Sequence, residues 1–218
     1  MSQKTRPPLP LLAAVGLVAT VLFIFGHLVD DFWLRFLAKP LPVAAMVLAL
    51  VGLREHRYAR TIAVGLGLCI FGDIFLELSD TYFVPGMIAF LSGHVAYIVA
   101  FVGRTRRPAP LAALPFAAWI GWAAWFLLPH LGELALPVIA YTLVIFTMMW
   151  RATAVATTES PTTRWAWLAM LGALMFGTSD TLIALDKFHA PIAGVRVPII
   201  LLYWGGQALI AASALREQ

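Results

Sequence analysis

Residues 60–79 read RTIAVGLGLCIFGDIFLELS, an apolar run interrupted by the carboxyl groups of Asp73 and Glu77. About 20 mainly apolar residues are enough for one helix to cross a bilayer. A carboxylate at the centre of such a helix costs roughly 2.5–3.5 kcal/mol on insertion scales, so acids inside spans face a polar interior and are functional candidates. The stretch therefore predicts a membrane-spanning helix that carries a functional carboxyl group at Asp73.

The whole chain has the composition of a membrane protein. Of its 218 residues, 61% are hydrophobic and 12% are charged, against about 45–50% and about 25% in soluble domains. The net charge of +4 does not indicate nucleic-acid binding, because the basic residues lie in the loops between apolar runs. Cys69 is the single cysteine, which excludes an intramolecular disulfide and a cysteine-based metal cluster.

Eight apolar runs predict an all-α, polytopic membrane protein in which residues 1–218 form a single domain, one bundle of eight transmembrane helices. The first run is followed by no small-residue cleavage site, so we expect it to remain as an uncleaved span. The expected spans cover residues 9–28, 36–53, 60–79, 83–103, 109–128, 134–152, 163–185 and 195–215.

The basic residues divide unequally between the two sides of the membrane that alternate spans define. Of the 15 Lys and Arg residues, eleven fall on the side of the two termini and four on the other side. We expect the protein to lie in a bacterial inner membrane. Because positive residues concentrate in cytoplasmic loops, we expect both termini on the cytoplasmic side. The eleven are Lys4, Arg6, Arg54, Arg57, Arg60, Arg104, Arg106, Arg107, Arg151, Arg164 and Arg216; the four are Arg35, Lys39, Lys187 and Arg196.

Polar residues inside the spans need partners within the protein, because lipid offers none. Asp73 with Glu77, and Tyr203 with Gln207, are four apart and so share a helix face. From the expected topology, most of these residues lie between the midplane and the outer interface, where one shared cavity would bring them together. The candidate catalytic residues are Asp73 and Asp180, and the candidate substrate-binding or orienting residues are Lys39, Glu77, His94, Tyr97, Tyr141, Ser179, Tyr203 and Gln207.

Several candidates have structural alternatives. For Glu77 we favour a side chain that extends to the outer surface, and Ser179 has the alternative of bonding to a carbonyl of its own helix. Tyr141 and Tyr203 are equally compatible with ordinary packing and a satisfied hydroxyl. The alternative for Asp73 and Asp180 is a structural pair with Lys39 or His94, and His94 alone is more typical of a structural hydrogen bond. Close helix approach is expected at Gly72, Gly93 and Gly177.

No metal site is predicted. Of the five histidines, His94 alone lies well inside a span, and neither His-x3-His nor His-Glu-x-x-His occurs. A zinc hydrolase with three nitrogen ligands is therefore disfavoured. A G-x-S-x-G nucleophile motif is also absent.

Short motifs resemble one family over nearly the whole chain. They are Lys39-Pro40; Gly72-Asp73-Ile74-Phe75-Leu76; Phe90-Leu91-Ser92-Gly93-His94-Val95-Ala96-Tyr97; Tyr141 with Met148; Phe176 with Ser179-Asp180-Thr181-Leu182-Ile183-Ala184; and Tyr203 with Gln207. In these features the chain resembles the YhhN family of integral membrane proteins, which includes the lysoplasmalogenases. Where relatives often read Tyr-Tyr-x-x-Gln, this chain has Tyr203-Trp204-Gly205-Gly206-Gln207 and keeps only the first tyrosine.

The resemblance implies hydrolysis of the vinyl ether of a lysophospholipid substrate, without a metal or organic cofactor. Such a reaction needs one protonated acid and one carboxylate, the division of roles known from glycoside hydrolysis. Asp73 and Asp180 are expected to divide these roles, in an order left open. The headgroup of the lipid is also left open, and another ether lipid is an alternative substrate. Membrane lipids are the expected surroundings, and a homo-oligomer is neither predicted nor excluded.

Two other function classes fit some of these residues. Intramembrane acids also mark ion pathways, so a small solute or proton-coupled transporter is the alternative. Against it, no span is expected to be broken in corresponding halves, because Pro85, Pro115, Pro137 and Pro198 lie near span ends. A third possibility is a non-catalytic membrane component whose polar residues join helices.

Overall fold

The computed structural model describes residues 8–53, 56–158 and 164–216. Within these ranges the regular structure is helical throughout, without strands, and eight stretches are long and apolar enough to cross a membrane. They are Leu9–Leu28, Phe32–Leu53, Arg57–Leu78, Asp80–Arg104, Pro110–His130, Gly132–Thr158, Arg164–His189 and Arg196–Leu215. The predicted all-α fold of eight spans is confirmed. Lys4, Arg6 and Arg54, three of the positive residues counted for the topology, lie outside the described residues.

The chain divides between Ala96 and Tyr97 into two compact units. The division falls inside helix α5 (Phe83–Arg104), so that each unit contains part of this helix. The expectation that all eight spans form one domain remains a prediction.

In unit 1, the helices that follow one another in the chain contact one another. Helix α1 (Leu9–Leu28) packs along α2 (Phe32–Ala38) and α3 (Leu41–Leu50), and α3 contacts α4 (Arg57–Leu78). The first part of α5 reaches α4, where a Cβ on Gly93 would lie 2.7 Å from the Cys69 Sγ.

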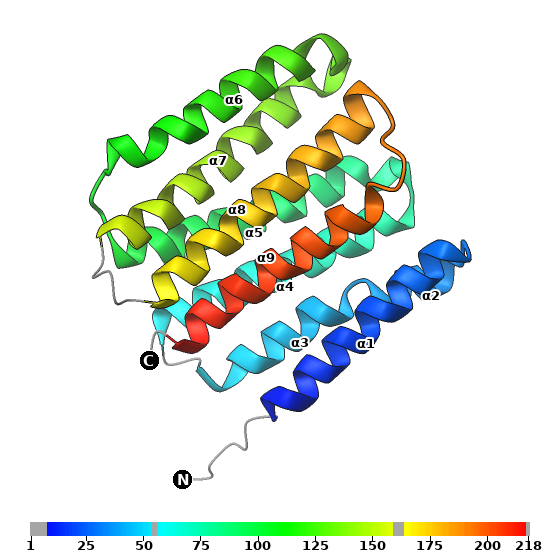
Figure 1. Ribbon diagram of the computed structural model, residues 1–218, viewed down its shortest axis with the longest axis horizontal. Coiled ribbons are helices and arrows are strands. Elements are labelled where there is room, and N and C mark those ends of the chain that lie inside the picture. The colour runs from blue at the N-terminus through cyan, green and yellow to red at the C-terminus, as the bar shows by residue number, and fades with distance from the viewer. Residues whose placement is uncertain (1–7, 54–55, 159–163, 217–218) are drawn as a thin grey trace. The chain divides into compact units, whose positions relative to one another are not determined.

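In unit 2, four long helices pack in chain order, as Figure 1 shows for α6 to α9. They are α6 (Leu114–Leu127), α7 (Ala135–Thr158), α8 (Arg164–Ala184) and α9 (Arg196–Arg216). A π-helical turn, Leu185–His189, extends α8.

The second span is interrupted at Lys39 and Pro40. Helix α2 ends at Ala38 and α3 begins at Leu41, because a proline supplies no N–H to continue the hydrogen-bond ladder. This interruption concerns one span, so the expectation that no span is broken in corresponding halves remains a prediction. The span also begins at Phe32 rather than at residue 36, which places Arg35 inside it.

Small residues allow the closest helix contacts. A Cβ added to Gly172 of α8 would lie 2.6 Å from the carbonyl oxygen of Gly206 in α9, so the two backbones approach each other directly. In the same way, Gly72 faces the Phe90 ring and Gly177 faces the Met149 side chain. The predicted close approach at Gly72, Gly93 and Gly177 is confirmed, and it shows the small-residue contacts that membrane helices use in place of a hydrophobic driving force.

Candidate functional site

Asp180 and Tyr141 form a pair between α8 and α7. The Tyr141 hydroxyl donates to Asp180 Oδ2 at 2.5 Å, and both residues are half-buried. Gly177 lies on α8 one turn before Asp180 and closely approaches the Met149 side chain of α7. This close approach brings the two helices near enough for the bond between Tyr141 and Asp180. A hydrogen bond from a neutral hydroxyl fixes the direction of the carboxyl group, and Oδ1 has no hydrogen-bond partner among the described residues. The pair can therefore hold a carboxyl group in place while leaving one oxygen for chemistry.

Ser179 joins α8 to α9 rather than bonding within its own helix. Its hydroxyl is buried and donates to the carbonyl oxygen of Ile199 at 2.9 Å. The alternative of a local bond is therefore wrong for Ser179, although the neighbouring Thr178 does bond back to Leu174. This contact fixes α8 beside the start of α9 and so helps to orient the next residue, Asp180.

Tyr97 and Gln207 form a fully buried pair within unit 2. The Tyr97 hydroxyl donates to Gln207 Oε1 at 2.6 Å. Gln207 Nε2 is buried with no hydrogen-bond partner among the described residues, and leaving a buried donor unsatisfied costs about 1–3 kcal/mol. One turn earlier on α9, the buried Tyr203 ring contacts the Phe176 ring edge-on at 5.1 Å. The amide of Gln207 is thus a buried donor whose orientation is set by the bond from Tyr97.

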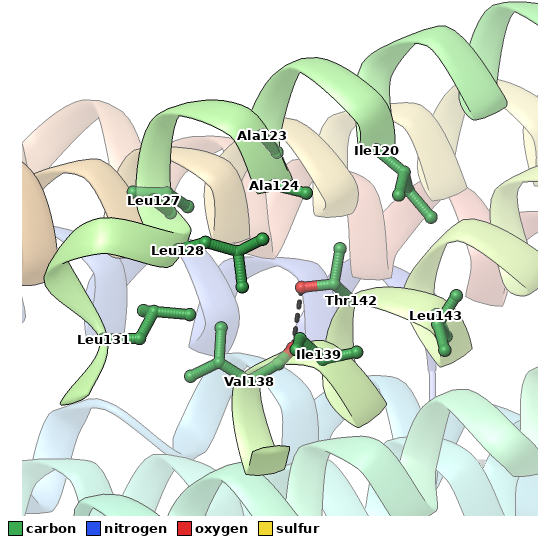
Figure 2. Close-up of a pocket in the computed structure, with 10 residues that line it drawn as sticks. All are labelled: Ile120, Ala123, Ala124, Leu127, Leu128, Leu131, Val138, Ile139, Thr142 and Leu143. Atoms are coloured by element: carbon green, nitrogen blue, oxygen red, sulfur yellow. Dashed lines mark hydrogen bonds between the residues drawn. The ribbon is translucent and has the colours of Figure 1, made fainter. Parts of the chain in front are cut away.

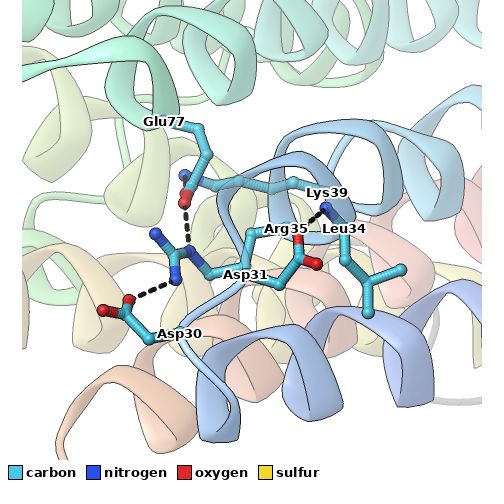
Figure 3. Close-up of polar contacts among 6 residues, drawn as sticks. All are labelled: Asp30, Asp31, Leu34, Arg35, Lys39 and Glu77. Atoms are coloured by element: carbon cyan, nitrogen blue, oxygen red, sulfur yellow. Dashed lines mark hydrogen bonds and ion pairs between the residues drawn. The ribbon is translucent and has the colours of Figure 1, made fainter.

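Glu77 and Lys39 meet in a buried charge cluster of unit 1, drawn in Figure 3. Lys39 Nζ donates to Glu77 Oε2 at 3.1 Å, and Arg35 Nε donates to Oε1 of the same carboxylate at 3.0 Å. Glu77 is buried, so the favoured expectation that it extends to the outer surface is wrong. Two cations supply the partners that a carboxylate inside a span requires.

Arg35 is a member of this cluster that the sequence did not single out, because it was counted only as a topology charge. Its position four residues before Lys39 was the available signal, since residues at this spacing lie on one helix face. Arg35 Nη1 also contacts Asp30 at 2.8 Å. Asp31, the next residue, caps α2 by accepting from the Leu34 N–H at 2.9 Å.

Asp73 and His94 lie in the interior of unit 1. Asp73 is almost completely buried on α4, one turn before Glu77, and His94 is fully buried on α5. Asp73 belongs to unit 1 and Asp180 to unit 2, and the predicted cavity shared by the two aspartates remains a prediction.

An apolar groove lies between α6 and α7 (Figure 2). It encloses about 370 Å³ of empty space, part of it open. Thr142 is its one polar lining side chain, and the Thr142 hydroxyl donates to the carbonyl oxygen of Val138 in its own helix at 2.7 Å. The rest of the lining is apolar, and no lining side chain is titratable. The other lining residues are Ile120, Ala123, Ala124, Leu127, Leu128, Leu131, Ile139 and Leu143.

The sequence profile of the YhhN family matches residues 34–214, a range that contains every candidate residue from Lys39 to Gln207. The chain belongs to the YhhN family. Lysoplasmalogenase TMEM86A of Bos taurus is 37% identical to this YhhN protein over 195 residues, which cover 85% of the chain and 80% of the relative. Lysoplasmalogenase TMEM86B of Homo sapiens is 33% identical over 187 residues, covering 85% and 77%.

A bacterial relative is also similar to this YhhN protein over a shorter range. A lysoplasmalogenase of Mycobacterium bovis is 33% identical over 138 residues, which cover 60% of the chain and 50% of the relative. No solved structure matches the chain significantly.

Proposed function

We propose that this YhhN protein is a membrane-embedded lysoplasmalogenase that hydrolyses the vinyl ether bond of a lysoplasmalogen. The observation that carries the proposal is the similarity to relatives named lysoplasmalogenase over 85% of the chain. The products are a fatty aldehyde and a glycerophospho-alcohol. Placement of the protein in a membrane agrees with a lipid substrate.

The reaction consumes one water and proceeds through a cation. An acid protonates the β-carbon of the vinyl ether, which turns the α-carbon and its oxygen into an oxocarbenium ion. Water adds to the α-carbon and loses a proton, giving a hemiacetal. The hemiacetal hydroxyl then loses its proton and forms the carbonyl of the aldehyde, while the bond from the same carbon to the glycerol oxygen breaks and that oxygen takes up a proton. A carboxylate close to the cation lowers the barrier, and a carboxyl group supplies the first proton.

Asp73 and Asp180 divide these two roles in the proposed mechanism. The hydrogen bond from Tyr141 supports a fixed orientation of the Asp180 carboxyl group. The burial of Asp73 supports a water-poor environment for the Asp73 carboxyl group. Gln207 Nε2, held through Tyr97, is available to orient the attacking water. His94, Tyr203 and Ser179 have positioning roles in this proposal.

Release of aldehyde by the purified full-length protein tests the proposal. In a coupled assay with lyso-vinyl-ether lipids carrying choline or ethanolamine, we expect stoichiometric aldehyde formation. A transporter, the less favoured alternative, moves solute across reconstituted vesicles without covalent change. Solute uptake without aldehyde formation from any lyso-vinyl-ether lipid would refute the proposed hydrolase activity.

A further inference from the structure

Unit 1 holds an excess of positive charge around the Glu77 carboxylate. Arg35 and Lys39 each donate to it, and their side chains are 13% and 11% exposed, against 2% for Glu77. The contact from Arg35 to Asp30 offsets little of this charge, because the Asp30 side chain is 94% exposed and well hydrated. Two largely buried cations therefore share one buried carboxylate.

Both cations keep unused hydrogen-bond donors. A guanidinium carries five N–H donors and an ammonium three. Arg35 uses Nε on Glu77 and Nη1 on Asp30, and Lys39 uses one donor on Glu77. The described residues give neither side chain a further acceptor. Nη2 of Arg35 and two N–H groups of Lys39 are thus available to an external anion.

The cluster lies where a bilayer carries its anions. Glu77 is the residue before the end of α4 at Leu78, and Arg35 lies in the short helix α2, with which the second span begins. Ends of spans lie at the level of the lipid headgroups. Phosphate is the common anion at that level, and a guanidinium fork fits two phosphate oxygens at once.

We propose that Arg35 and Lys39, held by Glu77, form a binding site for the phosphate of the lysolipid substrate, with Arg35 as the directional contact. This inference rests on the proposed function for the identity of the lipid. Asp73 lies one turn before Glu77 on α4, about 6 Å along the helix axis at 1.5 Å per residue. Only the three glycerol carbons separate the phosphate from the vinyl ether. Anchoring the phosphate therefore places the vinyl ether at the depth of Asp73.

Paired substrates test the phosphate contact in the full-length protein in uncharged detergent. One substrate is the lyso-vinyl-ether phospholipid, and the other is the corresponding alkenylglycerol, which has the same vinyl ether but no phosphate. We expect Arg35→Gln and Lys39→Gln each to raise KM for the phospholipid about tenfold to hundredfold, the usual effect of losing a hydrogen bond to a charged group. KM for the alkenylglycerol stays within about twofold. Lys187→Gln removes a cation elsewhere as the matched control and leaves both values unchanged.

Equal losses on both substrates, or no loss on the phospholipid, would overturn the site. If Arg35→Gln does not fold, Arg35→Lys keeps the ion pair and removes the fork. This variant is expected to weaken only phospholipid binding, and unchanged binding of the phospholipid would count against the directional contact.

Direct binding separates this inference from the catalytic proposal. An alkyl-ether lysophospholipid, which has no vinyl ether to cleave, should bind the wild type at least tenfold more tightly than the alkylglycerol and should lose this preference in Arg35→Gln. Inorganic phosphate should compete only weakly, and equal affinity for it would overturn the lipid assignment. If the phospholipid preference is found and no aldehyde ever forms, the proposed phosphate-binding site is supported and the proposed hydrolase activity is refuted.

Discussion

The Tyr141 hydroxyl holds one oxygen of the Asp180 carboxyl at 2.5 Å, so Tyr141→Phe removes one hydrogen bond and little volume. Because a hydrogen bond to a charged group contributes about 1.5–3 kcal/mol, we expect kcat for aldehyde release to fall about tenfold to hundredfold. The KM value should change little, since the phosphate contact is unaffected. Tyr82→Phe makes the same chemical change at an exposed tyrosine and should leave kcat unaltered. An equal loss in both variants would contradict the role of Tyr141.

The Glu77 carboxylate is the buried partner that Arg35 and Lys39 share, and its loss should destabilise the fold. Glu77→Gln removes the buried carboxylate that Arg35 and Lys39 share, and removing one partner of a buried ion pair costs about 3–5 kcal/mol. Thermal unfolding in detergent should show a large drop in Tm. Asp30→Asn removes the exposed carboxylate on the same arginine and should leave Tm almost unchanged. Similar Tm values for the two variants would show that burial of the charge cluster does not contribute to the thermal stability of the protein.

Individual residues were partly predictable from the sequence. The cost of a polar group in lipid was enough to single out Lys39, Asp180 and Gln207, because that cost depends on the residue type and its span alone. Their partners were not predictable, because Arg35 is separated from Glu77 by 42 positions and Tyr97 from Gln207 by 110. Only the packing of the helices decides which of these distant residues meet.

At the scale of helices, the contact between α8 and α9 depends on Gly172 and Gly206. A methyl group on Gly172 would lie 2.6 Å from a backbone oxygen, which cannot turn aside as a side chain can. We expect Gly172→Ala to lower the stability by about 1–3 kcal/mol, as overpacked cores do. Gly121→Ala is the matched control on α6, since a Cβ there meets nothing within 4 Å. It should raise the stability slightly by reducing the freedom of the unfolded chain, and a loss equal to that of Gly172→Ala would contradict the close contact.

The helices themselves were predictable because apolar length is a property of each segment alone. The eight expected spans match the observed ones, with ends that differ by several residues. The interruption at Lys39 and Pro40 was less clear, because a proline near a predicted span end usually marks the end itself. The expected second span begins at residue 36 and leaves out the four residues from Phe32 to Arg35, and in the structure the charge of Arg35 is satisfied by Glu77.

For the whole molecule, the distribution of basic residues predicts both termini in the cytoplasm. Cys69 is fully buried, so the wild type provides a low background for thiol labelling. We expect a membrane-impermeant maleimide to label Lys187→Cys in intact cells. Arg106→Cys should react only after permeabilisation, and its labelling in intact cells would contradict the orientation.

In the proposed mechanism, Asp73 and Asp180 act on one bound lipid. The most direct measurement is kcat/KM for aldehyde release by the wild type, Asp73→Asn, Asp180→Asn and the double variant, each purified and shown to be folded by its Tm. Residues that act as one catalytic unit lose activity non-additively. We predict that each single variant loses at least about a thousandfold and that the double variant loses little more. Substantial activity in either single variant would contradict the proposed roles of the two aspartates.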